Sequence, residues 1–405
     1  MAKIYEKSIL LDQDREKKGL DTIVIDENVV DVLDRLDKKA GQVLVLSSKR
    51  IPTVFVDNIH DCLERSNYVV QRYTPCAQNF KLDEGVGVIV AIGEEEFLNR
   101  VKIESYCEDT TLVAIPSEFS LSNVLSRECN MEYGELCIKR EGKVPDCVIF
   151  SSELMISIKS EDYASSLCSL FSKIPSVCDY AYRLAILGEE FSTTCEDILS
   201  KFDKVIDTIK WRTCDNTLKV FDLCLELDSV FEKVGLKKGG GDQLSTTISR
   251  FMKAYDRRNF DIRELAFSSA LIVCRTYLKF LSKKTPYGVR DYSLDIEGGK
   301  EWLRLSDNEA IKIAKGYDEN YKYEDYKVEL MRKELYEIAK ISNEILNRAN
   351  ERIKKIYPDG GYHFRYYLTA KEGVKLLPLA PYYDYSDTLL SFIKERGLLE
   401  FAKKI

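Results

Sequence analysis

Residues 86–102 read VGVIVAIGEEEFLNRVK and join an apolar run to a charged helical pattern. The run at 86–92 is β-branched and too short for a helix, so it predicts a buried strand. Helical spacing begins after Gly93. In a doubly wound sheet, a strand that enters a helix at a glycine is where phosphate groups bind. The stretch therefore predicts a parallel α/β sheet, but three glutamates occupy its turn.

Five further segments have the apolar composition of buried strands. They lie at residues 21–25, 42–48, 67–73, 110–117 and 146–152. Helical patterns separate them, and this alternation predicts a parallel sheet covered on both faces. From about residue 160 onward the apolar spacing is helical. The sequence thus predicts an α/β, Rossmann-like, nucleotide-binding-like domain at 1–160 and an all-α helical domain at 161–405. A charged, tyrosine-rich insertion is expected at about 283–332.

Length and charge argue against several classes of protein. The 405 residues suffice for two domains with substantial cores. The 60 basic and 67 acidic residues are well mixed and give a net charge of −7, which argues against nucleic-acid binding. No apolar run approaches the ~20 residues that cross a membrane, and the charged start is not typical of a signal peptide. Twelve cysteines without a CxxC pair indicate reduced thiols, so we expect a cytoplasmic protein.

Histidine is scarce, because the chain has only His60 and His363. His60 sits in a helical pattern and His363 follows a turn, so we expect both to be ordinary structural or surface residues. A metal centre with two histidine ligands would have to use both of them. No histidine lies between residues 61 and 362.

Short motifs occur in the order of a known superfamily. Residues 93–102 are similar to a GGG-x-x-x-D-x-x-K turn, with Lys102 at the lysine position. Residues 115–120 are similar to a VPT-x-x-S segment, residues 145–151 to the strand after it, and Asp179-Tyr180 to an Asp-Trp pair. With its α/β half before a helical half, the chain resembles the superfamily of dehydroquinate synthase, glycerol dehydrogenase and iron-containing alcohol dehydrogenases. The likeness is strongest to the sn-glycerol-1-phosphate dehydrogenases.

The resemblance implies a dehydroquinate synthase-like fold and an oxidoreductase that uses NAD(P). By position it makes Gly93, Ser117 and Ser120 candidates for cofactor binding. By position it also makes Lys102 and Asp261 candidates for catalysis. Members of the superfamily often self-associate, so the resemblance also implies a homo-oligomer.

The superfamily holds a catalytic metal ion with one aspartate and two histidines, and this chain differs from that set. The resemblance places Ser169, Gln243 and Asp261 at the three positions. A hydroxyl, an amide and one carboxylate bind Zn²⁺ or Fe²⁺ poorly, since these ions prefer imidazole and carboxylate ligands. We therefore expect no zinc or iron. Without that Lewis acid, hydride transfer loses the stabilisation of its alkoxide.

The glutamates after Gly93 argue against a bound pyrophosphate. Glu94, Glu95 and Glu96 stand where free N–H groups and a helix dipole would meet it. A carboxylate within ~5 Å of a phosphate costs about 3 kcal/mol at an effective dielectric near 20. The same carboxylate gains ~0.3–1 kcal/mol in the first turn of a helix. We expect a solvated helix start, with a cation site as the alternative, and no bound cofactor.

A glycine triplet at 239–241 is a second place where an anion could bind. It lacks the strand and the GK[ST] sequence of a P-loop. We expect a helix–helix turn with Asp242 as the N-cap, and the alternative is an anion contact at the start of the next helix.

Two functions remain open. In the first, the chain is a divergent glycerol-1-phosphate dehydrogenase-like protein that has lost metal-dependent hydride transfer. It would then bind a small molecule or a protein in the cleft between its domains. In the second, it is an active NAD(P)-dependent oxidoreductase for a polyol or polyol phosphate, with a site rearranged around Lys102, Ser117, Ser120, Asp242 and Asp261. We favour the first, because both the phosphate turn and the metal set are altered.

Overall fold

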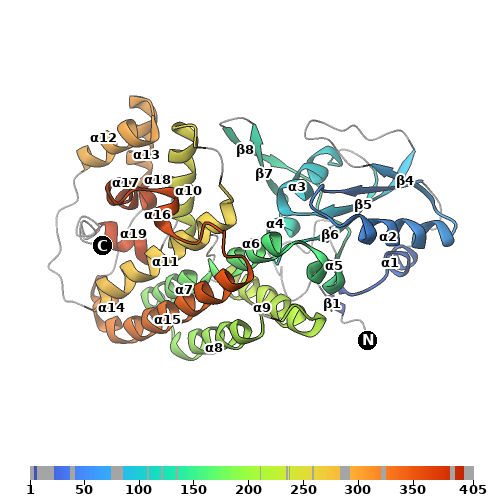
Figure 1. Cartoon of the computed structure of the whole chain (residues 1–405). Helices are drawn as coiled ribbons and strands as arrows, with labels where there is room; N and C mark the ends of the chain where they lie inside the picture. The colour runs from blue at the N-terminus through green and yellow to red at the C-terminus, as the bar shows by residue number, and fades with distance from the viewer. Residues whose placement is uncertain are drawn as a thin grey trace. The chain divides into compact units, whose positions relative to one another are not determined.

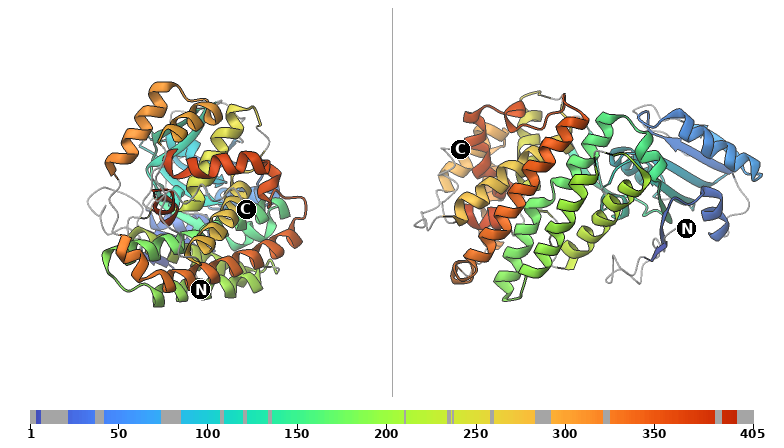
Figure 2. Two further views of the ribbon diagram at one scale, coloured as in Figure 1. Left: turned by 90° about the vertical axis from the view of Figure 1, so that its left-hand side faces the viewer. Right: turned by 60° about the horizontal axis from the view of Figure 1, so that its bottom comes forward.

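The chain forms two compact units, drawn as ribbons in Figures 1 and 2. The computed structural model describes residues 4–6, 22–36, 42–73, 85–106, 109–119, 122–133, 136–209, 211–233, 236, 238–257, 260–282, 292–320, 325–383 and 388–395. The sheet unit comprises Met1–Ser166 and Trp211–Ser229, and the helical unit comprises Leu167–Lys210 and Val230–Ile405. The domain ranges expected from the sequence stay a prediction, but they did not anticipate that Trp211–Ser229 lies in the sheet unit.

A seven-stranded sheet forms the centre of the sheet unit. Its strands lie in the order β1 (Ile4–Glu6), β2 (Thr22–Ile25), β9 (Cys147–Phe150), β6 (Thr111–Pro116), β5 (Val86–Gly93), β3 (Gln42–Ser47) and β4 (Val69–Tyr73). β1 is antiparallel to β2, and the other neighbours are parallel. Nearly every residue of β3, β5, β6 and β9 is buried, as in strands covered on both faces. The predicted parallel α/β sheet is confirmed.

Short helices connect the strands of the sheet unit. They are α1 (Val29–Arg35), α2 (Thr53–Arg65), α3 (Glu95–Glu104), α4 (Ser122–Leu125) and α5 (Ser152–Ser157). A two-stranded antiparallel ribbon, β7 (Glu128–Tyr133) and β8 (Leu136–Glu141), lies between β6 and β9 in the chain. Two helices, α6 (Ser160–Phe171) and α9 (Cys214–Lys233), run from the residues of one unit into those of the other.

The strand order indicates where ligands bind in sheets of this kind. The carboxyl ends of parallel strands share one edge of a sheet, and ligands bind there, where the strand order reverses. The chain runs from β3 outward to β4 and then returns to β5 on the other side of β3. The reversal therefore lies between the end of β3, at Ser47, and the end of β5, at Gly93.

The helical unit consists of helices among its described residues. They are α7 (Ile174–Leu187), α8 (Ser192–Thr208), α10 (Gly240–Ala254), α11 (Ile262–Leu281), α12 (Tyr292–Leu303), α13 (Asp307–Asn320), α14 (Asp325–Leu330), α15 (Arg332–Ile356), α16 (Phe364–Tyr367), α17 (Ala370–Leu376), the 3₁₀ turn η2 (Leu377–Leu379), α18 (Ala380–Tyr383) and α19 (Leu389–Glu395). The right-hand view of Figure 2 shows α7, α8 and α15 side by side. No helix in the described ranges is both long and apolar enough to cross a membrane.

The predicted insertion at about 283–332 contributes packed helices. Residues 283–291 and 321–324 lie outside the described residues, and α12, α13 and α14 occupy the rest. The ring of Trp302 lies 6.1 Å from that of Phe251 in α10. Tyr255 Oη donates to the carbonyl oxygen of Glu301 at 2.9 Å. At least α12 therefore packs against the rest of the helical unit.

Candidate functional site

The carboxyl ends of β5 and β6 bring two of the predicted cofactor residues together. The Ser117 N–H donates to the Gly93 carbonyl at 2.9 Å. A Cβ on Gly93 would lie 2.7 Å from Phe97 Cδ1 and 2.9 Å from Ser48 Cβ. Protein side chains therefore fill the space on that side of the glycine. Ser120, the third predicted cofactor residue, lies outside the described residues.

The three glutamates begin α3, as the sequence suggests. Glu94 is the N-cap residue, and Glu95 and Glu96 lie in the first turn. The exposed Glu96 pairs with Arg100 at 3.5 Å. Glu94 differs, because its Oε2 is buried and has no hydrogen-bond partner among the described residues. Glu96 is thus exposed to solvent, as expected for the first turn of this helix. One oxygen of Glu94 is instead enclosed by protein.

Lys102, the predicted catalytic lysine, lies inside the sheet unit. Its side chain is only 1% exposed, and Nζ donates to the Ser126 carbonyl at 2.5 Å. Burial lowers the pKa of Lys102, and the Cys129 thiol and Glu95 oppose that shift. Its own carbonyl accepts the Lys143 N–H at 2.8 Å. These contacts link α3 to the residues that flank the β7–β8 ribbon, and the catalytic role stays a prediction.

The glycine triplet starts α10, and its N–H groups bind carboxyl groups of the protein itself. Gly239 is the N-cap residue, so Asp242 occupies the third helical position rather than the predicted N-cap. Asp242 accepts from the Gly239 N–H at 3.0 Å and pairs with Lys173 at 3.4 Å. The Gly240 N–H donates to Asp179 Oδ2 at 2.8 Å. The carboxyl group of Asp179 therefore takes the place that an external anion would occupy.

At two of the three predicted metal positions, Gln243 and Asp261, the side chain is hydrogen-bonded to other residues of the protein. Gln243 is fully buried, its Nε2 donates to Ser391 Oγ at 3.1 Å, and its Oε1 accepts from Thr388 Oγ1 at 2.7 Å. Asp261 is the N-cap of α11, and its Oδ1 accepts from the Arg263 N–H at 2.8 Å. Its Oδ2 pairs with the Arg263 guanidinium at 2.7 Å.

The third predicted position, Ser169, offers only a half-buried hydroxyl on α6. An amide whose two ends are engaged, a paired carboxylate and a hydroxyl do not fit Zn²⁺ or Fe²⁺, because such an ion needs free, convergent donors. As the structure places them, these three residues do not form a transition-metal site.

The sequence did not single out Glu264, which the structure buries beside other polar groups. Its carboxylate accepts from the Gly361 N–H. Burial raises the pKa of the Cys168 thiol, and the charges of Glu264 and Asp261 raise it further. Burial likewise raises the pKa of Tyr362 and of Tyr367, and neither hydroxyl has a partner among the described residues. A lone carboxylate on the apolar pattern of 262–281 was the signal that could have revealed this cluster.

Histidine contributes one cluster of potential ligands in the part of the chain that is described. His60, Asp61 and Glu64 of α2 offer ligand atoms within 4.8 Å of one another. His60 is half-buried and its Nδ1 lies 3.7 Å from Glu64 Oε2, whereas Asp61 and Glu64 are exposed. His363 is exposed. Both histidines therefore have the structural or surface setting expected of them.

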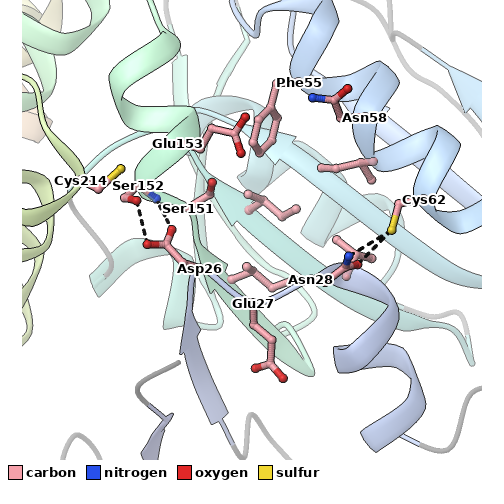
Figure 3. A pocket seen from close by; sticks show the side chains of 14 residues that line it. Asp26, Glu27, Asn28, Phe55, Asn58, Cys62, Ser151, Ser152, Glu153 and Cys214 are labelled. Atoms are coloured by element: carbon pink, nitrogen blue, oxygen red, sulfur yellow. Dashed lines mark hydrogen bonds between the residues drawn. The ribbon is translucent and has the colours of Figure 1, made fainter. Parts of the chain in front are cut away.

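A cavity of about 450 Å³ lies in the sheet unit near the carboxyl ends of β2, β6 and β9. Figure 3 shows its side chains, which come from the start of α1, from α2, from the start of α5 and from the sheet. The polar lining comprises Asp26, Glu27, Asn28, Asn58, Ser151, Ser152 and Glu153, with the thiols of Cys62 and Cys214. The apolar lining comprises Val29, Phe55, Ile59, Ile115 and Ile149. None of these residues was a candidate from the sequence.

Sequence comparison finds distant relatives of the chain. No protein-family model matches it. The glycerol-1-phosphate dehydrogenase of Thermoplasma acidophilum, named for NAD(P)⁺, is 20% identical over 196 residues, which are 44% of this chain and 55% of the relative. That of Pyrobaculum aerophilum is 23% identical over 157 residues, or 38% and 45% of the two chains. The chain thus matches about half the length of these curated relatives.

Solved structures match nearly the whole chain. The maleylacetate reductase of Rhizobium sp. strain MTP-10005 has a TM-score of 0.57 at 11% identity and covers 96% of this chain and 97% of its own. An iron-containing alcohol dehydrogenase from Thermococcus thioreducens has a TM-score of 0.54 at 14% identity, with 94% and 98% covered. The fold is that of the iron-containing alcohol dehydrogenases. The predicted superfamily resemblance and the dehydroquinate synthase-like fold are confirmed.

These relatives correct the expectation about cofactors. We expected neither NAD(P) nor zinc or iron, and that expectation conflicts with relatives named for NAD(P)⁺ and for iron. It rested on altered motifs alone, and a motif does not report contacts that other residues of the fold supply. NAD(P)⁺ and iron are therefore groups for which relatives of this chain are named.

Proposed function

We propose that this chain is a divergent glycerol-1-phosphate dehydrogenase-like protein that has lost metal-dependent hydride transfer and acts by binding a ligand. The observation that carries the proposal is the engagement of Gln243, whose amide is bound at both ends by Thr388 and Ser391. A Lewis acid assists hydride transfer because it stabilises the alkoxide that forms from the alcohol, a contribution of several kcal/mol. A buried, neutral amide at a ligand position does not support such a centre.

The sheet unit supports the same conclusion independently. The space beside Gly93 is filled by Phe97 and Ser48, and Glu94 stands at the start of α3. A pyrophosphate at this turn would have to displace packed side chains and approach a carboxylate. The proposal concerns the reaction alone, so a bound dinucleotide or metal ion without turnover is compatible with it. We expect the ligand to be a small molecule, in a cytoplasmic protein, with a protein partner or self-association as the other possibilities.

The proposal predicts no metal-dependent turnover. The purified protein, supplied with Zn²⁺ or Fe²⁺ and with NAD⁺ or NADP⁺, should give no change in nicotinamide absorbance with glycerol phosphates or polyols in either direction. Metal content and thermal shifts with each dinucleotide should be measured on the same sample. A ligand at a hundred times its Kd would add about 2.7 kcal/mol of stability, which such a shift detects.

Turnover that requires the metal and is lost in Asp261→Asn would establish the second function, an active oxidoreductase with a rearranged site. The exposed Asp203→Asn serves as the matched control, because its carboxylate pairs with Arg348 on the surface of α8 and is no part of either proposed site. Stabilisation by NAD(P) without turnover would leave the proposal standing and identify a retained cofactor.

A further inference from the structure

We infer that oxidation by a peroxide joins Lys102 to Cys129 through a covalent bond between Nζ and Sγ, and that this link connects the β7–β8 ribbon to α3. The inference goes beyond the proposed function and does not rest on it. It assigns to the sheet unit a modification site that responds to oxidants.

The amine and the thiol lie next to each other in the interior of the sheet unit. Lys102 is 1% exposed and Cys129 is 0% exposed. The two side chains are hydrogen-bonded to each other. A Cβ on Gly142 would lie 2.5 Å from Cys129 Sγ and 3.0 Å from Lys102 Cβ, so the Gly142 backbone packs against both side chains. A bond between Nζ and Sγ therefore requires only a small movement of either side chain.

Carbonyl groups next to β7 orient the pair. Lys102 Nζ donates to the Ser126 carbonyl at 2.5 Å. The Cys129 thiol donates weakly to the Arg127 carbonyl, with Sγ and the oxygen 3.8 Å apart. Ser126 and Arg127 directly precede β7, the strand that contains Cys129. The lysine side chain is thus held toward the beginning of the ribbon.

The surroundings allow the proton to move from the thiol to the amine. Burial lowers the pKa of Lys102 and raises the pKa of Cys129, which reduces the usual preference of the proton for lysine. The amine can therefore be neutral, and a neutral amine has a free electron pair with which to attack sulfur. It can also accept the thiol proton, and the thiolate is the form that peroxide oxidises.

The ribbon gives a small oxidant access to the thiol. Among the strands that the structure describes, β7 and β8 pair only with each other. A two-stranded ribbon is only marginally stable by itself. Arg127 and Glu128, which precede Cys129, are exposed. Local opening of the start of the ribbon therefore exposes Sγ without disrupting the seven-stranded sheet.

The reaction balances with hydrogen peroxide as the co-reactant. The thiolate attacks one peroxide oxygen, the O–O bond breaks, and the thiol becomes a sulfenic acid with release of water. Lys102 Nζ then attacks Sγ, so that an S–N bond forms and the S–O bond breaks. The leaving hydroxide takes a proton from the amine and departs as water. Sulfur loses two electrons to the peroxide, and the linked pair has two hydrogen atoms fewer than the separate side chains. Sulfenic acids condense with backbone nitrogen in the same way.

The link would couple oxidation to the helix that begins at the edge of the sheet. Lys102 lies in the last turn of α3, and α3 follows directly after the end of β5 at Gly93 and Glu94. Once joined to Cys129, this helix and the ribbon can no longer separate. The expected consequence is a more rigid ribbon in the oxidised protein.

Peptide mapping by mass spectrometry tests the inference. The full chain should be treated with hydrogen peroxide, digested without reductant and compared with the untreated chain. We expect a peptide pair that joins Lys102 to Cys129, lighter by two hydrogen atoms than its separate peptides, and its loss on treatment with dithiothreitol. Amides of residues 128–133 should exchange hydrogen at least about tenfold more slowly in the linked protein, because the link suppresses local opening.

Variants separate the link from general oxidation. Cys129→Ser removes the sulfur and should show neither the link nor the slower exchange. Lys102→Met removes the amine, so Cys129 should stop at a sulfenic acid that dimedone labels. Lys143→Met is the matched control, because the Lys143 amine donates to the Thr110 carbonyl, and the link should form unchanged.

The natural chain decides the inference even where a variant folds poorly. The exposed thiol of Cys214 shows in the same sample that peroxide has reacted. Oxidised Cys214 beside unlinked Lys102 and Cys129, or a link that retains an oxygen atom, would overturn the inference. Neither result bears on the turnover assay, so failure here does not decide the proposed loss of hydride transfer.

Discussion

Replacing Asp179 by alanine is expected to lower the free energy of unfolding by about 3–5 kcal/mol. Asp179 is fully buried and accepts from the Gly240 N–H at 2.8 Å, from Tyr277 Oη at 2.7 Å and from the Leu389 N–H at 2.9 Å. The donors belong to α10, α11 and the start of α19, so one carboxylate ties together three helices. Without it, two backbone N–H groups and a phenol stay buried without an acceptor, and each costs about 1–3 kcal/mol.

Urea unfolding followed by circular dichroism measures this loss. Asp207→Ala is the matched control, because that exposed carboxylate of α8 pairs with Arg348 at 3.2 Å. Exposed ion pairs contribute about 0–1 kcal/mol, so the control should barely change the midpoint. A similar small loss in both variants would mean that the Asp179 contacts do not hold the helical unit together.

Asp179 also predicts a dependence of stability on pH. Burial raises the pKa of Asp179 from 3.8 to about 7, although its three hydrogen bonds oppose the shift. The folded state therefore keeps its proton at pH values where the unfolded chain has released it. The resulting stabilisation is complete below about pH 4 and is lost as pH rises through about 7.

Asp179→Asn removes this titration. The free energy of unfolding of the natural chain, relative to that of Asp179→Asn, should fall steadily between pH 4 and pH 8. Both proteins should be unfolded in urea across that range. A difference that is flat, or that rises with pH, would show that Asp179 is ionised in the fold.

Phe221→Ala is expected to cost about 3–5 kcal/mol, the range for truncating a buried phenylalanine. Phe221 is fully buried, and its ring stacks on that of Phe150 in β9, with centroids 3.7 Å apart and an angle of 16° between the planes. Phe150 in turn lies 6.2 Å from Phe119. Truncating Phe221 therefore leaves a cavity against β9. The loss should affect the sheet unit, because residues 211–229 of the chain belong to it even though the helices before them belong to the helical unit.

Hydrogen exchange shows which part of the fold the Phe221→Ala substitution destabilises. Amides of β9 and of its neighbour β6 should lose protection in Phe221→Ala, because α9 packs on the sheet unit through this ring. Lys219→Ala, an exposed position on the same helix, should change stability by less than about 0.5 kcal/mol. Loss of protection confined to the helical unit would contradict the assignment of Trp211–Ser229 to the sheet unit.

The strands of the sheet could be predicted from the sequence because their signal is local. A parallel strand buried on both faces needs a continuous apolar run, and residues 86–92 show one that ends at a glycine. The helix after Gly93 could be predicted equally well, because its caps and charges lie within a few positions of its start. Motif spacing also indicated the superfamily, since the order of segments survives where single residues have changed.

The contacts of the site residues were harder to predict from the sequence, because they involve residues that are distant in sequence. Lys102 matches a motif lysine, yet the fold buries it against Ser126. Because no histidine lies between residues 61 and 362, the sequence does not fix the register of the third metal motif and does not distinguish Asp261 from Glu264. The cofactor expectation was wrong for a related reason: altered motifs say which contacts are lost, and they cannot report which contacts the rest of the fold supplies.

The sequence by itself determined the kinds of elements, their order and the likeness to the superfamily, because periodicity and motif order are properties of the chain read locally. Only the tertiary structure decided which side chains share a space. Gln243 meets Thr388 across 145 positions, and Asp26 meets Ser152 across 126. Such pairs leave no local pattern, since each partner is an ordinary residue of its own segment. The engaged amide of Gln243, on which the proposed function rests, therefore arises only when the folded chain brings these segments together.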